Sequence, residues 1–395
     1  MITQRHFGAR ALVNPLALLY AAIAVMVLAL TAQRSFYPHD HWTFWIFRAS
    51  FWHLLRQQDL YARYGRHDLF KYSPTAAVLF APLAFPPYAL ALLIWNALNA
   101  SALIYAIKRI ARKSDIALVI LLVMSELFVS MQASQCNALI AALIIMAFVA
   151  LERGRQIRGY LAIAIGLAIK IFPVAALTLA VFHARKLRGA AIFALWVLVL
   201  FLLPLMVTSP SMLMTQYGWW HRVEGSDALL HGSSVMWLLQ HALHVDLPNW
   251  PVQLAGVVVL LLPLLHRDRW ADEHFRRLFL TSLLVFVVIF NHQAERPSYI
   301  IAATGVAIWY TDSSREPYRL LLVLFSLTGL RALGYLPIWI VMQLELHRVP
   351  MPRFSRARSA SHIDVAVPLP ASGAHASAGV ALSERSNQSS TSAAW

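Results

Sequence analysis

Long apolar runs recur along this chain and constrain its fold more than any other feature of the sequence. A helix of about 20 residues crosses the roughly 30 Å hydrocarbon core of a bilayer. Of the 395 residues, 59% are hydrophobic and 13% are charged. The sequence therefore predicts an all-α polytopic membrane protein with about eight full spans. The uninterrupted runs lie at about 11–32, 86–107, 115–131, 136–151, 189–207, 250–265, 277–291 and 297–311.

Two further apolar runs, at 159–182 and 319–346, are interrupted near their middles. The interrupting residues are Lys170 with Pro173, and Arg331 with Gly334 and Pro337. Proline and charged residues break an apolar helix, and broken helices at membrane depth must lie against protein or a cavity. We therefore expect two hairpins of short helices, each returning to its starting side.

The basic clusters between the runs predict the topology. Lys and Arg are enriched in cytoplasmic loops. With a cytoplasmic N-terminus and two hairpins, all four clusters fall on the cytoplasmic side. The clusters lie at 108–113, 153–158, 185–188 and 267–277. The opposite side then carries both hairpin apices, the loops 33–73 and 208–249 and the turns 132–136 and 291–297.

The loop 33–73 is an exception, because it is basic and yet falls on the outer side. Such a violation favours an anionic ligand. Within this loop, aromatic and aliphatic residues recur at helical spacing from Phe44 to Leu55, beside Arg48 and His53. This pattern predicts an amphipathic helix on the outer leaflet. The following apolar piece, 73–85, is too short to cross and is expected to be re-entrant or interfacial.

The net charge of +15 does not indicate nucleic-acid binding, because the basic residues lie in short clusters between apolar runs. Cys136 is the only cysteine, so no intramolecular disulfide can form. We predict a membrane domain over 1–346 and a cytoplasmic tail over 347–395, basic at first and then rich in Ser and Ala, that is disordered.

Ionisable residues next to the spans are the candidate functional groups, because charge near the bilayer core is costly. Asp40 follows the first span, where it either acts as a general base or belongs to a solvated turn. Lys71 and Tyr72 precede the re-entrant piece, where they either bind a phosphate or sugar or form an interfacial belt with a snorkelling lysine.

Gln135 and Asn137 lie in the turn between two spans, where amides either bind hydroxyls or join helices. Lys170 lies between two apolar half-helices and needs a partner carboxylate or a ligand anion. We favour a functional role for Lys170.

Two further outer segments combine polar and aromatic residues. His221 follows Trp219 and Trp220, a combination that suits a head group but also an interfacial belt. His292, Glu295 and Arg296 lie within one short turn between two spans. That density of ionisable residues favours a binding role.

In their order along the chain, these motifs resemble glycosyltransferase family 87, the polyprenyl-phosphate-mannose-dependent mannosyltransferase-like family of the GT-C membrane superfamily. The resemblance covers roughly residues 11 to 346. The matching pieces are 46–50, 59–61, 72–74, Gln135 with Asn137, Lys170 with Pro173, and 291–299.

The resemblance implies inverting transfer of a sugar, such as the hexose mannose, from a polyprenyl-phosphate donor to a lipid or glycan acceptor on the outer face. An acidic residue of the first outer loop is expected to be the base. Thr43 stands in the register of that acid, so the expected base is Asp40, three residues upstream.

The chemistry needs cations for the departing phosphate. Lys170, His292 and Arg296 are expected to bind it, with Lys71 as a further candidate. Tyr72, Trp219 and Trp220 are expected to shape the sugar and acceptor sites. No zinc or nucleotide-binding motif is present in the sequence, and the need for a divalent cation stays open.

Two alternatives remain. A transporter or flippase of lipid-linked glycans would use similar cations and broken helices, and it predicts inverted repeats. A catalytically inactive GT-C-like protein would agree with Thr43. In each case the expected location is the bacterial inner membrane.

Overall fold

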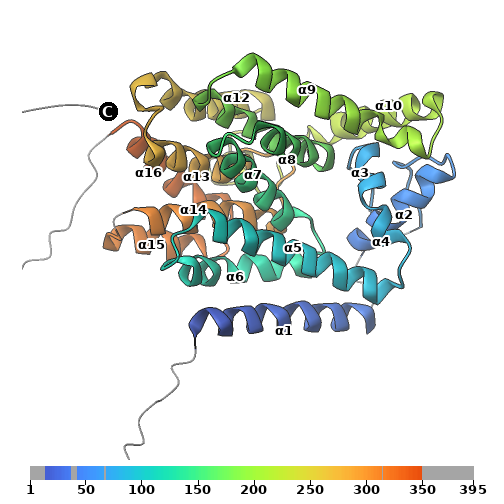
Figure 1. Ribbon diagram of the computed structural model, residues 1–395, viewed down its shortest axis with the longest axis horizontal. Coiled ribbons are helices and arrows are strands. Elements are labelled where there is room, and N and C mark those ends of the chain that lie inside the picture. Colours follow the sequence, from blue (N-terminus) through green and yellow to red (C-terminus); the bar gives the residue numbers. More distant parts are fainter. Residues whose placement is uncertain (1–13, 37–41, 66–67, 314, 349–395) are drawn as a thin grey trace, which may run out of the picture. The chain divides into compact units, whose positions relative to one another are not determined.

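The computed structural model describes residues 14–36, 42–65, 68–313 and 315–348. Every regular element in these ranges is a helix, and the helices share one apolar core (Figure 1). The all-α prediction is therefore confirmed for the described residues. The tail predicted from 347 onward lies, from residue 349, outside the described residues and remains a prediction.

Each predicted apolar run contains a helix at nearly the predicted place. These helices are α1 (Pro15–Phe36), α5 (Tyr88–Ile110), α6 (Ile116–Gln132), α7 (Asn137–Glu152), α9 (Lys186–Leu202), α12 (Asn249–Leu261), α13 (Glu273–Ile289) and α14 (Tyr299–Asp312). Among the described residues, three segments are long and apolar enough to cross a membrane: α1, α5, and α9 with its 3-10 extension to Met206. The other apolar helices are shorter, so the count of eight spans stays a prediction.

The interior of the bundle contrasts with its border. α13 and α14 pack side by side, and every residue of α14 from Tyr299 to Thr311 is buried. On the border, the most apolar window of the α9 segment is only 11% buried. An apolar helix surface that no protein covers is typical of contact with lipid. α1 and α9 occupy opposite borders in Figure 1.

The interrupted run 159–182 forms α8 (Gln156–Ile169) and the 3-10 helix η2 (Phe172–Phe182). Lys170 has an extended backbone that separates them, and Pro173, the second residue of η2, lies close to Gly166. The start of α8 and the end of η2 lie together, since the Gln156 side chain donates to the Ala184 carbonyl at 3.3 Å. The segment thus folds back on itself, as a hairpin does.

The second interrupted run forms α15 (Pro317–Ser326) and α16 (Ala332–Leu346). Of the predicted interrupting residues, Arg331 precedes α16, but Gly334 and Pro337 lie inside it, so the expectation that they break the helix was wrong. The turn between them contains Gly329, with a φ of +82°, which a glycine adopts without strain. The start of α15 and the end of α16 are joined by an ion pair of 2.6 Å between Arg319 and Glu345. This segment also returns to its starting end.

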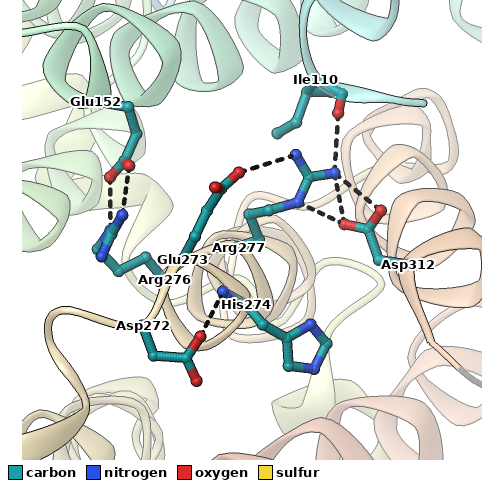
Figure 2. Close-up of polar contacts among 8 residues, drawn as sticks. All are labelled: Ile110, Glu152, Asp272, Glu273, His274, Arg276, Arg277 and Asp312. Atoms are coloured by element: carbon teal, nitrogen blue, oxygen red, sulfur yellow. Dashed lines mark hydrogen bonds and ion pairs between the residues drawn. The ribbon is translucent and has the colours of Figure 1, made fainter. Parts of the chain in front are cut away.

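One end of the bundle is held by paired charges, and we call it the ion-pair end. Arg276 and Glu152 form two parallel hydrogen bonds of 2.8 Å, and so do Arg277 and Asp312 (Figure 2). Arg277 also donates to the Ile110 carbonyl at 2.8 Å. Bidentate pairs of this kind are geometrically specific. They join the ends of α5, α7 and α14 to the start of α13.

Five helices lie at the other end of the bundle: four are seen on the right of Figure 1, and the fifth, α11, begins beside the turn that follows α13. They are α2 (Trp42–Leu55), α3 (Pro74–Leu79), α4 (Ala81–Ala84), α10 (Pro210–Asp227) and α11 (Val235–Ala242). The predicted helix after the first span is therefore present as α2. Phe44, Phe47 and Leu54 are fully buried, whereas Leu55 is 42% exposed, and α2 packs on α3 and α4. Its position on the outer leaflet stays a prediction.

Arg48 of α2 has a structural role in this region. Its guanidinium donates to the carbonyls of Leu83, Ala84 and Pro86, where α4 ends. Those carbonyls lie at a helix end and lack helical partners of their own. One of the basic residues of the loop 33–73 is thus explained by helix capping.

Candidate functional site

A polar cavity lies at the end of the bundle opposite the ion-pair end. α7 begins there and α8 and α13 end there, which brings five distant stretches of the chain together. Its volume is about 170 Å³. The polar lining residues are Lys71, Tyr72, Gln135, Lys170, Trp220, Glu224, Asp227, Asn291, His292, Gln293 and Glu295.

Lys170 brings a positive charge to the cavity. α8 stops at Ile169, and Lys170, which follows it, has an extended backbone. Its side chain is part of the cavity lining. The ammonium donates to the Asn137 side-chain oxygen at 2.9 Å and lies 5.9 Å from the centre of the Tyr72 ring. Within the described residues it forms no ion pair. Its partners are neutral, so the charge remains available to an anion.

Lys71 has a carboxylate partner. Its ammonium lies 2.8 Å from Asp227 Oδ2. Burial by itself lowers the pKa of Lys71, but the hydrogen bond and the charge of Asp227 outweigh burial, so the pKa is raised above its ordinary value. Lys71 therefore stays protonated, and Asp227 fixes its position.

Glu224 is held by two neutral donors. Trp220 Nε1 lies 3.2 Å from one carboxylate oxygen and Gln293 Nε2 lies 3.0 Å from the other. Gln293 also donates to Asp227 at 3.3 Å. Burial raises the pKa of Glu224 above its ordinary value. Through Gln293, α10 is tied to the turn that follows α13.

Tyr72 and Gln135 form another polar contact in the lining. The Tyr72 hydroxyl donates to Gln135 Oε1 at 3.3 Å, and the Tyr72 carbonyl accepts from the Tyr61 hydroxyl at 2.9 Å. The phenol is thereby placed beside both Gln135 and Lys170. An aromatic face next to an amide and a cation suits a sugar attached to a phosphate.

His292 presents a hydrogen-bond donor. Gln253 Nε2 lies 3.0 Å from His292 Nδ1 and 3.1 Å from the Phe290 carbonyl, which fixes the amide as a donor to the ring. Burial lowers the pKa of His292, and nearby His231 lowers it further against the opposing effect of Asp227. The neutral ring then carries its proton on Nε2. This nitrogen is buried and has no partner among the described residues.

Gly232 supports the turn that carries His292. Its φ is +52°, and a Cβ there would stand 2.4 Å from the His292 carbonyl oxygen. The adjacent Ser233 N–H donates to the Ala294 carbonyl at 2.6 Å. Any larger residue at position 232 would push this turn away.

The structure thus brings most of the predicted site residues to one place. Lys71, Tyr72, Gln135, Lys170, His292 and Glu295 line the cavity, and Asn137 binds Lys170. The sequence analysis did not single out Glu224, Asp227 or Gln293. The spacing of Trp220, Glu224 and Asp227, at i, i+4 and i+7, places the three on one helix face and was the available signal.

Three predicted residues lie elsewhere. Arg296 does not line the cavity, because its guanidinium binds Glu126 at 3.0 Å, and the Glu126 side chain is 1% exposed. A buried carboxylate needs such a partner. His221 and Trp219 also do not line the cavity, and His221 is exposed on α10.

The predicted base, Asp40, lies outside the described residues. Thr43, which stands in the register of the expected acid, is half-buried in α2. Among the described residues, no group of three or more His, Cys, Asp and Glu side chains could hold a metal ion.

The helical fold and the cavity together define an α-helical membrane protein with a polar site at one end of its bundle. A family model, glycosyltransferase family 87, matches residues 70–290. The match covers more than half of the chain, so the chain belongs to glycosyltransferase family 87 and is a membrane glycosyltransferase. The matched segment contains Lys71, Gln135 and Lys170 and ends just before the turn that carries His292. No curated protein matches the chain.

Proposed function

We propose that this protein transfers a hexose, such as mannose, from a polyprenyl-phosphate donor to a hydroxyl of a lipid or glycan acceptor. One observation carries the proposal: the Lys170 ammonium faces the polar cavity with only neutral partners among the described residues. A charge in this position is costly unless an anion joins it. The donor phosphate is the anion that a membrane glycosyltransferase would bring.

In the proposed reaction, the acceptor oxygen attacks the anomeric carbon from the face opposite the phosphate, and configuration is inverted. The acceptor proton passes to the carboxylate of Asp40, and the bond between the anomeric carbon and the phosphate oxygen breaks. Negative charge grows on the departing polyprenyl phosphate. Lys170 stabilises this charge, and the Nε2–H of neutral His292 donates to the same phosphate.

The remaining lining residues suit the sugar. Gln135 and Gln293 are amides that can both donate to and accept from sugar hydroxyls. Tyr72 and Trp220 offer aromatic faces. Lys71 also lines the cavity, and its charge is paired with that of Asp227. Arg296 is left out of the phosphate site because Glu126 occupies its guanidinium.

The proposed orientation places the polar cavity toward the periplasm or exterior of a bacterial inner membrane, with the N-terminus in the cytoplasm. The support is the distribution of basic loops, because the segments 108–113, 153–158, 185–188 and 267–277 all adjoin the ion-pair end. Cytoplasmic loops are the more basic ones.

The test is a transfer assay with purified full-length protein in detergent. Polyprenyl-phosphate mannose carrying a radiolabelled sugar is incubated with a total lipid extract as the acceptor source, and the labelled products are separated by chromatography. We expect label to move to a new product, and Lys170→Met to remove that product. Donor binding without any transfer would contradict the proposal and favour a carrier of lipid-linked glycans. In that case, movement of the donor across vesicles would be measured.

A further inference from the structure

A strongly basic hollow lies at the ion-pair end, away from the polar cavity. It forms because the hairpin of α8 and η2 returns the chain to the point where α8 began, so the stretches 151–158 and 183–192 lie together. Its volume is about 660 Å³. Four arginines line it: Arg155, Arg158, Arg185 and Arg188. We call this site the basic hollow.

The charge of these four arginines is not neutralised within the described part of the chain. All four are exposed, and none forms an ion pair with another described residue. The one carboxylate in the lining, Glu152, is already bound by Arg276 and has His183 Nε2 at 3.5 Å. By contrast, Arg276, Arg277 and Arg319 at the same end of the bundle all have carboxylate partners.

Two helices also begin at the basic hollow. Arg155 and Arg185 are the residues before the first turns of α8 and α9, and neither side chain caps its helix. The first N–H groups of a helix lack helical partners and carry partial positive charge. They add to the attraction that the arginines exert on an anion.

The border of the hollow is apolar and open. Leu151 and Ile192 belong to the lining, and the lining residue Ile157 is 57% exposed. α9 runs from the hollow along the border of the bundle, and its apolar surface is largely uncovered. A topological requirement for cytoplasmic positive charge explains arginines at this end. It does not explain a hollow with apolar sides that continue into a helix facing lipid.

We propose that the basic hollow binds the phosphate headgroup of an anionic membrane lipid, whose acyl chains lie along α9. Arginine forms paired hydrogen bonds with phosphate oxygens, and basic pockets between membrane helices suit such headgroups. α8 has 14 residues and spans about 21 Å. It separates this site from Lys170, so the lipid site is distinct from the site of sugar transfer.

The experiment compares binding of lipids to the full chain in detergent by native mass spectrometry. The ligands are phosphatidylglycerol, phosphatidylcholine with the same acyl chains, and inorganic phosphate. The test variant is Arg155→Gln with Arg185→Gln. It leaves Arg158, Lys186 and Arg188 in place, so the basic character of both loops, and hence the topology, is retained. The matched control is Arg112→Gln with Lys113→Gln, two exposed cations at the same end that do not line the hollow.

We expect phosphatidylglycerol to bind the unmodified protein at least tenfold more tightly than phosphatidylcholine does. The test variant should lose about tenfold in affinity for phosphatidylglycerol, and the control variant should stay within about twofold, in line with the attraction expected per basic residue at an anionic membrane surface. Equal losses in both variants would overturn the proposal, because general surface charge would then account for binding. Inorganic phosphate that binds as tightly as the lipid would overturn the lipid as the ligand.

Two further measurements separate a loss of lipid binding from a loss of folding. A second variant, Arg188→Gln, removes one lining arginine from the exposed surface of α9 and should lose affinity by a smaller factor in the same direction. Retained thermal unfolding midpoints in all variants accompany the expected outcome. A variant that binds phosphatidylglycerol normally without Arg155 and Arg185 contradicts the proposal.

Discussion

Two sets of cations at opposite ends of the helix bundle differ in their partners: Arg276 and Arg277 are bound to carboxylates, whereas Lys170 is not. At the ion-pair end, Arg276 and Arg277 each form two hydrogen bonds with a carboxylate. At the cavity end, Lys170 has only an amide oxygen as hydrogen-bond partner among the described residues. A buried charge that already has its counterion stabilises helix packing once formed, whereas a charge left with neutral partners is poised for a ligand. The difference predicts that substitutions at the two ends will separate stability from substrate binding.

The largest expected effect is on the rate of sugar transfer when the proposed base, Asp40, is replaced. Asp40→Asn should reduce the rate of sugar transfer about a thousandfold, because a general base contributes about 10²- to 10⁴-fold. Donor affinity should change less than about twofold, since no phosphate contact is lost. Initial rates and donor binding measured on the same preparation test this. Thr43→Ala is the control and should transfer normally. An unchanged rate for Asp40→Asn would reject the assignment.

At the ion-pair end, Arg277→Ala should destabilise the protein by about 3–5 kcal/mol, because it leaves Asp312, whose side chain is 10% exposed, without a partner. Donor affinity of the folded protein should be unchanged. Denaturant titration in micelles measures the free energy of unfolding, and a donor-binding assay measures the affinity for the donor. Replacing both partners, Arg277→Leu with Asp312→Leu, should cost less than the single change. If the single change instead weakened donor binding, the contrast between the ends would fail.

At the cavity end, Lys170→Met should weaken donor binding about 10- to 100-fold, which corresponds to the loss of one hydrogen bond from a charged group. The free energy of unfolding should change by less than about 1 kcal/mol, because the protein itself loses one hydrogen bond to Asn137 and two distant ring contacts, with Tyr72 and Phe172. Lys186→Met is the control, since Lys186 stacks on Trp270 outside the cavity. A large loss of stability with normal donor affinity would make Lys170 a structural residue.

Gly232→Ala tests whether the turn that carries His292 needs a glycine beside it. The positive φ and the approach to the His292 carbonyl predict a loss of about 1–3 kcal/mol in unfolding free energy. Gly225→Ala is a matched control, because Gly225 lies in α10 with no atom near its missing Cβ. Thermal unfolding of the two variants in parallel gives the answer. Equal midpoints for both variants would show that the turn does not need glycine.

The smallest effect concerns pH. Burial lowers the pKa of His292 below the ordinary value of 6.5. Below about pH 6.5, His292 becomes protonated in the unfolded chain but stays neutral in the folded protein. The free energy of unfolding therefore falls as the pH falls, until the pH reaches the lowered pKa of the folded state. The slope is at most about 1.4 kcal/mol per pH unit. His292→Asn should reduce the pH dependence between pH 7 and 5. An identical dependence would show that His292 is not the buried neutral group inferred here.

Several residues of the cavity lining could be picked out from the sequence, whereas the contacts among them could not. Lys170 with Pro173 marked the helix break, and Gln135 and His292 marked turns at the same end. Each of these residues would be costly in an apolar helix, which makes it visible in sequence. Glu224 and Asp227 were not singled out because α10 is a polar helix, where carboxylates are ordinary.

Arg296 illustrates the opposite case. In the sequence it stands beside His292 and Glu295 and resembles a phosphate ligand as much as they do. In the structure its side chain turns to Glu126, a carboxylate 170 residues away on α6. No local pattern reveals such a pairing, because it depends on the rotation of α6 against the turn after α13.

The sequence by itself determined the helical fold, the family and the helix break at Lys170, because the apolar runs and the cost of charge in lipid are local properties of the chain. Only the tertiary structure decided which charges are neutralised and which are left for ligands. That outcome depends on how distant helices pack, and it distinguishes Arg277, bound to Asp312, from Lys170, which faces the cavity.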